Sequence, residues 1–473
     1  MRIAAFITAL CLSASTAYGQ IGGDEATALA DAERSNLPPD SIGGDLSLGK
    51  VGEDWFLTLG LGITIERDLW GFGARVPLRF RIFDRDPDNP SDPGGLRRED
   101  WDQPSDFLRV LRFVYVGQRD KKGPYYVRAG QLSSLGIGYG TIMHRYHNGL
   151  DAARFHAGIN AAVNIDAYGG EAMIGDLLSP YLFGGRFTVR PLQVAWGEGY
   201  WDRLVTGFSL LTDVTAPLQL TSSMDRVVTN EGIPSVERDR ALVISGLDVG
   251  FEVVTLPFLT ITPYTALNKM SVVDHGLGWH AGVLWRVTVP LVLDTFEADL
   301  RTEYQRVSGD YRGPYFNTVY EIERYQVLAS NGGSRRTKLG VLCGNLADCS
   351  QGNPGAKNGV FLDLRAGLPN WIYVGGEYLN YDGGRDEGTL RLSLEVPALE
   401  FVEFSAFYFR INITGTDDLF AIDDRSAIVA QATVPIAWVL SAQARWWRVW
   451  QATDDGYMSV DDWSVGVGVN LTL

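Results

Sequence analysis

The sequence predicts an all-β fold, a transmembrane antiparallel β-barrel of about 18–20 strands with short turns at one end and long loops at the other. Three observations predict it: long segments of strict apolar–polar alternation, aromatic residues at their ends, and proline turns that alternate with long polar loops. Soluble strands average about five or six residues, whereas a strand that crosses a membrane needs about 9–11. The alternating segments here reach that greater length, which disfavours the alternative of a secreted β-sandwich or solenoid.

Residues 1–19 have the features of a cleaved signal peptide. A positively charged start is followed by an apolar segment, and Ala17 and Gly19 then supply small residues before the expected cleavage point. We therefore expect an exported protein, with a flexible polar tail over residues 20–44 and the barrel over residues 45–473.

Period-two alternation is clearest in residues 55–66, 296–305 and 463–473. Such alternation gives a strand two unlike faces, which in a membrane barrel are an apolar outer face and a polar lumen face. Trp and Tyr suit the headgroup depth of a membrane because their rings are amphipathic. Tryptophans gather at the ends of the predicted strands, at Trp55, Trp70, Trp201, Trp371, Trp438, Trp446, Trp447, Trp450 and Trp463.

The predicted connections differ between the two ends of the barrel. Short turns are expected at residues 67–71, 119–124, 166–169 and 190–202, and at Pro257, Pro290, Pro369, Pro397 and Pro435. Outer-membrane barrels have short periplasmic turns and longer extracellular loops. The long loops are expected at residues 84–105, 133–153, 215–239 and 308–358.

Charged residues of one phase identify the expected lumen face. Arg75, Arg79 and Arg81 alternate with apolar residues, and an Arg that faces lipid costs roughly 2–4 kcal/mol at mid-membrane. These charges are consistent with a wet, charged pore, or with an ion-pair network that fills a narrow barrel. In the first case the three arginines face an acidic strand across the lumen and create a transverse field. The predicted pore-lining residues are Arg75, Arg79, Arg81, Arg286, Glu297, Asp299, Arg301, Glu303, Asp363 and Arg365.

A glycine-rich segment at residues 135–147 contains two histidines. No helix pattern follows it, so it is not a dinucleotide-binding loop. It could fold into the barrel mouth as a constriction or lie on the surface as an ordinary loop. A metal site is disfavoured because the two histidines lack an obvious third ligand, and we expect neither metal nor cofactor. The constriction hypothesis rests on Gly138, Tyr139, His144, Arg145 and His147.

After signal cleavage the chain keeps two cysteines, Cys343 and Cys349, within the longest loop. Two thiols so close together in an exported loop favour a disulfide over a pair of unbridged thiols. We expect this bridge to stiffen the loop and to carry no chemistry.

Composition excludes two classes of function. A net charge of −16 leaves no basic face for nucleic acid. Only five histidines are present, and none stands in a hydrolase motif, so no enzymatic activity is expected.

The signal peptide, the alternating strands, the aromatic strand ends and the terminal residues Asn470, Leu471, Thr472 and Leu473 together resemble Gram-negative outer-membrane porin-like barrels. The resemblance covers nearly the whole mature chain and implies a barrel among outer-membrane lipid and lipopolysaccharide. It implies a channel for polar solutes, or alternatively the membrane barrel of a polysaccharide export or secretion assembly with protein partners. A structural barrel with a closed lumen is the third interpretation.

Overall fold

The computed structural model describes residues 40–472, and the expected signal peptide and most of the expected tail lie outside the described residues. Within this range the description omits residues 52–53, 84–94, 98–99, 102–103, 119–122, 150–155, 221–234, 293, 326–336, 383–387, 400–401, 414, 424, 438 and 454–455.

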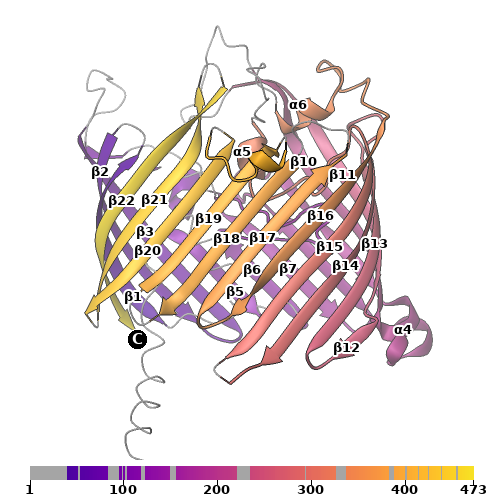
Figure 1. Cartoon of the computed structure of the whole chain (residues 1–473), viewed down its shortest axis with the longest axis horizontal. Helices are drawn as coiled ribbons and strands as arrows, with labels where there is room; N and C mark the ends of the chain where they lie inside the picture. The colour runs from indigo at the N-terminus through magenta and orange to yellow at the C-terminus, as the bar shows by residue number, and fades with distance from the viewer. Residues whose placement is uncertain are drawn as a thin grey trace, which may run out of the picture.

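Twenty antiparallel strands form a closed barrel, which confirms the predicted fold class and strand count (Figure 1). Two further strands, β4 (Gly95–Leu96) and β12 (Val254–Leu256), are short and pair with β3 and β13. The wall consists of β1 (Ser41–Val51), β2 (Asp54–Glu66), β3 (Trp70–Phe83), β5 (Leu111–Gly117), β6 (Tyr125–Gly130), β7 (Gly158–Ile165), β8 (Tyr168–Ile174), β9 (Leu182–Val189), β10 (Leu204–Leu220), β11 (Val236–Phe251), β13 (Leu259–Met270), β14 (Leu277–Pro290), β15 (Thr295–Ser308), β16 (Ala356–Leu368), β17 (Ile372–Tyr381), β18 (Gly388–Leu399), β19 (Val402–Ile413), β20 (Ser426–Ala437), β21 (Leu440–Thr453) and β22 (Gly456–Thr472).

The first and last strands close the barrel. β1 pairs with β22 from Ser41 opposite Thr472 to Lys50 opposite Trp463, and it pairs with β2 on its other side. Closure leaves no open edge, so the backbone groups of the wall are satisfied within it. The first strand begins at Ser41, four residues before the expected boundary at residue 45.

The two ends of the barrel differ as expected. One end, the short-turn rim, carries the first residue of β1, the last of β22 and the connections that were expected to be short. Pro257 and Pro369 lie in turns there, whereas Pro290, Pro397 and Pro435 belong to the last residues of β14, β18 and β20. The expected short turn at residues 190–202 was wrong, because that connection contains two short helices, and residues 119–122 of another lie outside the described residues. The other end, the long-loop rim, carries the loops that contain α3 (Pro104–Phe107), η2 (Leu108–Val110), α5 (Tyr320–Glu323), α6 (Lys338–Leu342) and η4 (Thr416–Asp418) (Figure 1).

One predicted loop was wrong in its extent. Residues 215–239 were expected to be loop, but β10 continues to Leu220 and β11 already begins at Val236. Pairs such as Ala216 with Arg240 extend the hairpin beyond a register shift. Charged residues at the start of β11 hid this extension, because they break the apolar alternation from which the strands were predicted.

The two faces of the wall have the expected chemistry. On β3, Phe80 and Ile82 are 38% and 55% exposed, whereas Arg75 is only 6% exposed. Large apolar side chains are exposed on most strands of the barrel, while the buried charged residues include Arg301 and Glu303. Among the described residues, no helix has the length and apolarity needed to cross a membrane.

Part of the interior is an apolar core built from loops and wall together. Residues 131–149, here called the inner loop, follow β6 in the connection to β7, and residues 309–355, here called the long loop, connect β15 with β16. Their buried side chains pack with strands from β8 to β17 in one cluster. This cluster includes Leu135, Met143, Tyr146, Phe316, Tyr320, Leu211 and Phe361.

Candidate functional site

The inner loop lies inside the barrel as a folded hairpin. Leu135 and Tyr146 exchange two backbone hydrogen bonds of 2.9 Å, and the side chains of both are buried. Met143 bridges to Phe316 of the long loop, so the two loops are fastened together. The hairpin turns at Gly138, whose φ of 59° lies in the left-handed region that glycine adopts without strain. The loop of the constriction hypothesis therefore does not lie on the outer surface.

The tip of the inner loop rests on the wall through polar and aromatic contacts. The backbone N–H of Gly138 donates to Glu171 at 3.0 Å. The Tyr139 ring stacks on Tyr264 of β13, with centroids 4.5 Å apart and planes 9° apart. The Arg186 guanidinium lies 5.2 Å from the Tyr139 centroid and donates to Asp248 at 3.0 Å. These contacts fix the tip against strands β8 to β13.

The other arm of the inner loop is held by polar contacts of His144 and by an ion pair of Arg145. His144 Nε2 lies 3.1 Å from Asp363 Oδ2 on β16 and 3.4 Å from Glu377 Oε2 on β17. Arg145 Nη2 donates to Asp363 Oδ1 at 3.0 Å. We call His144, Arg145, Asp363 and Glu377 the loop latch, because they join the inner loop to the wall across the largest sequence separations in the site.

Three atoms of the loop latch, one each from His144, Asp363 and Glu377, lie close enough together to hold a metal ion. Arg301 Nη1 donates to His144 Nδ1 at 3.4 Å, which places the imidazole hydrogen on Nε2, pointing at the carboxylates. Arg145 also supplies a positive charge to Asp363. A cation would have to displace the Nε2 hydrogen and lie beside guanidinium groups, so the latch is better suited to hydrogen bonds from His144 and to the ion pair between Arg145 and Asp363. The expected lack of a metal stays a prediction.

Arg301 and Glu303 of β15 belong to a fully buried network. Glu303 accepts from Arg301 Nη2 at 2.6 Å and is paired with His280 Nδ1 at 2.8 Å. Arg301 Nε donates to the Tyr264 hydroxyl at 2.8 Å, and its Nη1 donates to the Gly140 carbonyl of the inner loop at 3.3 Å. The network therefore joins the inner loop to the wall at β13 and β15.

The remaining predicted charges of β14 to β16 lie nearer the short-turn rim. Arg286 Nε donates to Asp299 at 2.9 Å, and both side chains are exposed. Glu297 accepts from the Tyr373 hydroxyl at 2.9 Å, and the Arg365 guanidinium lies 3.9 Å from the centroid of the same ring. These contacts join residues of β14 to β17 to one another, so this group is distinct from the loop latch.

The three arginines of β3 are paired with carboxylates near them. Arg75 lies 2.8 Å from Asp45, and Arg81 lies 3.0 Å from Asp54. Arg79 lies 3.1 Å from Asp100 in the loop that follows β3.

Asp100 is also paired with two further arginines. Arg97 and Arg109 lie 2.8 and 2.7 Å from its Oδ1. Burial alone would raise the pKa of the Asp100 carboxyl, but Arg79, Arg97 and Arg109 together hold the pKa below its usual value. Charges on both β3 and β15 are compensated by close partners, which weakens a field between the two strands, and the expected transverse field stays a prediction. A buried charge without a partner is costly, and alternation reveals the face of a residue but not its partner.

His147 is buried and lies apart from the loop latch. Its Nδ1 accepts a hydrogen bond from the Gly149 N–H at 3.0 Å. Burial lowers the pKa of His147 to about 4, below the ordinary imidazole value of about 6.5. The two histidines of the segment therefore do not form a pair, and His147 has a packing role.

We expect the packing of the inner loop to weaken in acid. A displaced loop binds a proton on His147 more readily than the packed loop, so packing is strongest above pH of about 6.5 and is lost as the pH falls toward about 4. Hydrogen–deuterium exchange over residues 131–149, corrected for intrinsic rates, should show rising exchange across this window. His147→Asn keeps an acceptor for Gly149 and should flatten the dependence; unchanged protection of the wild type would contradict this role.

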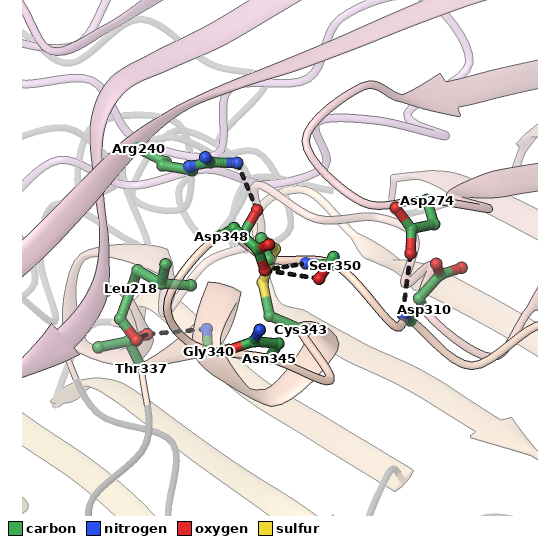
Figure 2. Close-up of a disulfide and its surroundings, with 12 residues drawn as sticks. Leu218, Arg240, Asp274, Asp310, Thr337, Gly340, Cys343, Asn345, Asp348 and Ser350 are labelled. Carbon is green, nitrogen blue, oxygen red and sulfur yellow. Dashed lines mark hydrogen bonds between the residues drawn. A yellow bond between two sulfur atoms is a disulfide. The ribbon is translucent and has the colours of Figure 1, made fainter.

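Cys343 and Cys349 are joined in a disulfide in the long loop (Figure 2). The bridge follows α6, whose capping Thr337 accepts from the Gly340 N–H at 2.8 Å and donates to the Leu218 carbonyl of β10. Arg240 of β11 donates to the Asp348 carbonyl between the cysteines (Figure 2). The bridged segment therefore fastens the long loop to the extended β10–β11 hairpin.

We expect thiol labelling to find both cysteines oxidised. Denatured, non-reduced protein should incorporate no maleimide at Cys343 and Cys349, and reduction should expose both thiols. Because the bridge holds the bend after α6, Cys343→Ser with Cys349→Ser should increase proteolysis of the long loop and leave the strands intact. Quantitative labelling without reductant would refute the bridge.

Sequence reasoning missed several residues that hold the inner loop. Glu377, Tyr264 and His280 were not predicted as site residues, although each has the inward phase of its strand. The inward phase of these residues, combined with the strand pairing that sets Glu377 beside Asp363, could have identified them. The apolar residues of the inner loop were a second signal, because exposed surface loops are mostly polar.

No protein-family model matches this chain, and no curated protein matches it. Solved structures with a similar outline include Pseudomonas aeruginosa OccK11 (OpdR), at 11% identity and a TM-score of 0.34, covering 92% of this chain and 96% of that one. Escherichia coli Wzi, described as an outer-membrane protein involved in group 1 capsule assembly and as a carbohydrate-binding β-barrel, is 12% identical, with a TM-score of 0.35 and coverage of 96% and 90%. A mutant of the ferric enterobactin receptor PfeA from Pseudomonas aeruginosa is 10% identical, with a TM-score of 0.34 and coverage of 93% and 81%.

Proposed function

We propose that this protein is an outer-membrane β-barrel channel for polar solutes, in which the inner loop narrows the passage. The observation that carries the proposal is the combination of a closed wall with an apolar outer face and a polar interior into which a loop is folded. An apolar surface of this extent is unstable in water and suits lipid. Residues 1–19 would direct export, and phospholipid and lipopolysaccharide would surround the barrel.

The width of the barrel explains why a loop is needed inside it. Barrels of about 16–18 strands leave an aqueous channel, and those of about 22 strands hold a plug. Twenty strands fall between these classes, and here the inner loop and the long loop occupy part of the interior. A passage would run beside these loops, and its cross-section would depend on the loop latch.

The charges on the wall bear on which solutes would pass. Arg75 with Asp45, Arg186 with Asp248 and Arg286 with Asp299 are compensated pairs at close range. Such pairs supply donors and acceptors without a strong net field. We therefore propose small, uncharged hydroxylated solutes as the preferred class, with weak discrimination between anions and cations.

One observation favours a second candidate, the membrane barrel of a polysaccharide export or secretion assembly. The apolar cluster between the inner loop and the long loop, which includes Met143, Phe316 and Tyr320, fills the interior beside β8 to β17 near the long-loop rim. Apolar contacts of this kind could hold the barrel shut until a protein partner displaces a loop.

Purified protein in planar bilayers and in liposomes tests the two candidates. The channel proposal predicts stable conductance with a reversal potential near zero in a salt gradient, and swelling of liposomes in small neutral sugars. Conductance that is absent even after the loop latch is broken would overturn the channel and favour the partner-dependent barrel. Recovery of the protein as a soluble periplasmic species would overturn both.

A further inference from the structure

The connection between β9 and β10 differs from the other connections of the short-turn rim. It spans residues 190–203 and contains α4 (Pro191–Trp196) and η3 (Tyr200–Arg203), whereas the other connections there are short turns. Figure 1 shows α4 beside the barrel, outside the wall and near β12. We call residues 190–203 the rim shelf.

The rim shelf exposes large side chains that are usually buried. Trp196 is 70% exposed, Val194 and Trp201 are each 55% exposed, and Tyr200 is 50% exposed. Trp and Tyr combine a large apolar ring with a polar group, which suits a boundary between an apolar phase and water. The chemistry of the shelf therefore matches a membrane interface better than bulk water.

The shelf is fixed to the outer face of the wall. The rings of Tyr200 and Trp201 lie 5.6 and 6.1 Å from the ring of Phe251 at the end of β11. Phe251 shares a face with Leu247 and Val249, because alternate residues of a strand point the same way. Both of these residues are exposed on the outer face. The two rings of the shelf therefore continue the apolar outer surface of β11 instead of covering the lumen.

Local geometry holds the shelf in this place. The Gly197 N–H donates to the Gln193 carbonyl at 2.8 Å, and its φ of 80° turns the chain after α4. The Arg203 guanidinium lies 5.1 Å from the centroid of the Tyr200 ring. The neighbouring hairpin of β12 and β13 adds Leu256 at the end of β12 and Phe258 in the turn, both exposed, to the same part of the rim.

We propose that the rim shelf binds the phospholipid headgroup layer of the membrane at the short-turn rim, with α4 lying along the lipid surface. The proposal rests on the membrane location given under the proposed function. Continuity with the outer face of β11 and the Trp and Tyr content favour lipid as the occupant. A second copy of the chain or a periplasmic protein are the competing occupants that the experiment must exclude.

The test measures the depth of a probe on α4. Val194→Cys is labelled with an environment-sensitive dye and reconstituted in nanodiscs of phosphatidylethanolamine and phosphatidylglycerol that carry spin-labelled lipids. Asn370→Cys, at the exposed turn between β16 and β17 of the same rim, is the matched control. Quenching by shallow spin labels should be at least about two-fold stronger at residue 194 than at residue 370, and iodide quenching correspondingly weaker.

Other outcomes overturn the proposal in distinguishable ways. Strong iodide quenching at residue 194 without lipid quenching would show a shelf in water. Protection that appears only at high protein concentration, together with dimers in mass photometry, would assign the shelf to a second copy. Protection that requires periplasmic extract would assign it to a protein partner. A chain that does not enter nanodiscs at all would instead refute the membrane location itself.

Discussion

Arg145→Gln should increase the conductance of the channel and the fluctuations of its open level. The substitution removes the charged donor that holds the inner loop to Asp363 through hydrogen bonds of 3.0 and 3.2 Å. Hydrogen bonds to charged groups contribute about 1.5–3 kcal/mol, and each change of about 1.4 kcal/mol shifts an equilibrium ten-fold. The population of the displaced loop should therefore rise at least about ten-fold. Single-channel recording measures both the mean conductance and the fluctuations.

Arg286→Gln is the matched control. It also removes one lumen arginine from an ion pair, but that pair, with Asp299, lies between β14 and β15 near the short-turn rim and not at the inner loop. It should change conductance little and leave the fluctuations as they are. If both variants behaved alike, the effect would come from lumen charge and not from the position of the inner loop, and the loop latch would have no role in the width of the passage.

Val467→Arg should impair assembly of the barrel. Val467 is 45% exposed on the outer face of β22, and it pairs with Leu46 of β1 and Ala442 of β21. An Arg on the lipid face near mid-membrane costs roughly 2–4 kcal/mol. The folded fraction, measured as heat-modifiable mobility after insertion into lipid vesicles, should fall at least about ten-fold at equilibrium.

Gln443→Arg on the neighbouring strand is the control for this prediction. Gln443 pairs with Gly466, so it lies one residue out of phase with the Val467–Ala442 pair and faces the interior. It should fold nearly as well as the wild type. Equal loss of folding in both variants would contradict the assignment of the outer and inner faces of the wall at β21 and β22.

The wall of the barrel could be predicted from the sequence because its determinants are local. Alternation over residues 55–66 and 463–473 marks two strands, which the structure places as β2 and β22 on either side of β1. Proline turns such as Pro369 give the side of the membrane on which neighbouring strands meet. Alternation fails where the strand leaves the apolar layer, as at Arg238 and Arg240 on β11, and the predicted boundaries failed there too.

The interior could be predicted only in part, because its contacts join distant segments. His144 and Asp363 are 219 residues apart, and their meeting depends on how far the loop folds into a closed wall. The inward phase of Asp363 was predictable. The carboxylate partners of Arg75 and Arg81 were not, because an inward-facing arginine can pair with a carboxylate on any neighbouring strand or loop. The rim shelf escaped prediction for a related reason, because a short helix between strands leaves no trace in a period-two pattern.

The most direct test of the central claim, a channel narrowed by the inner loop, is the size limit for neutral polymers. Polyethylene glycols of increasing length are added to both sides of a planar bilayer that holds the wild type or Arg145→Gln, and the shortest polymer that no longer lowers conductance gives the limit. The account predicts a small limit for the wild type and a clearly larger limit for Arg145→Gln, with Arg286→Gln matching the wild type. The same size limit in all three proteins, or conductance in none of them, would contradict it.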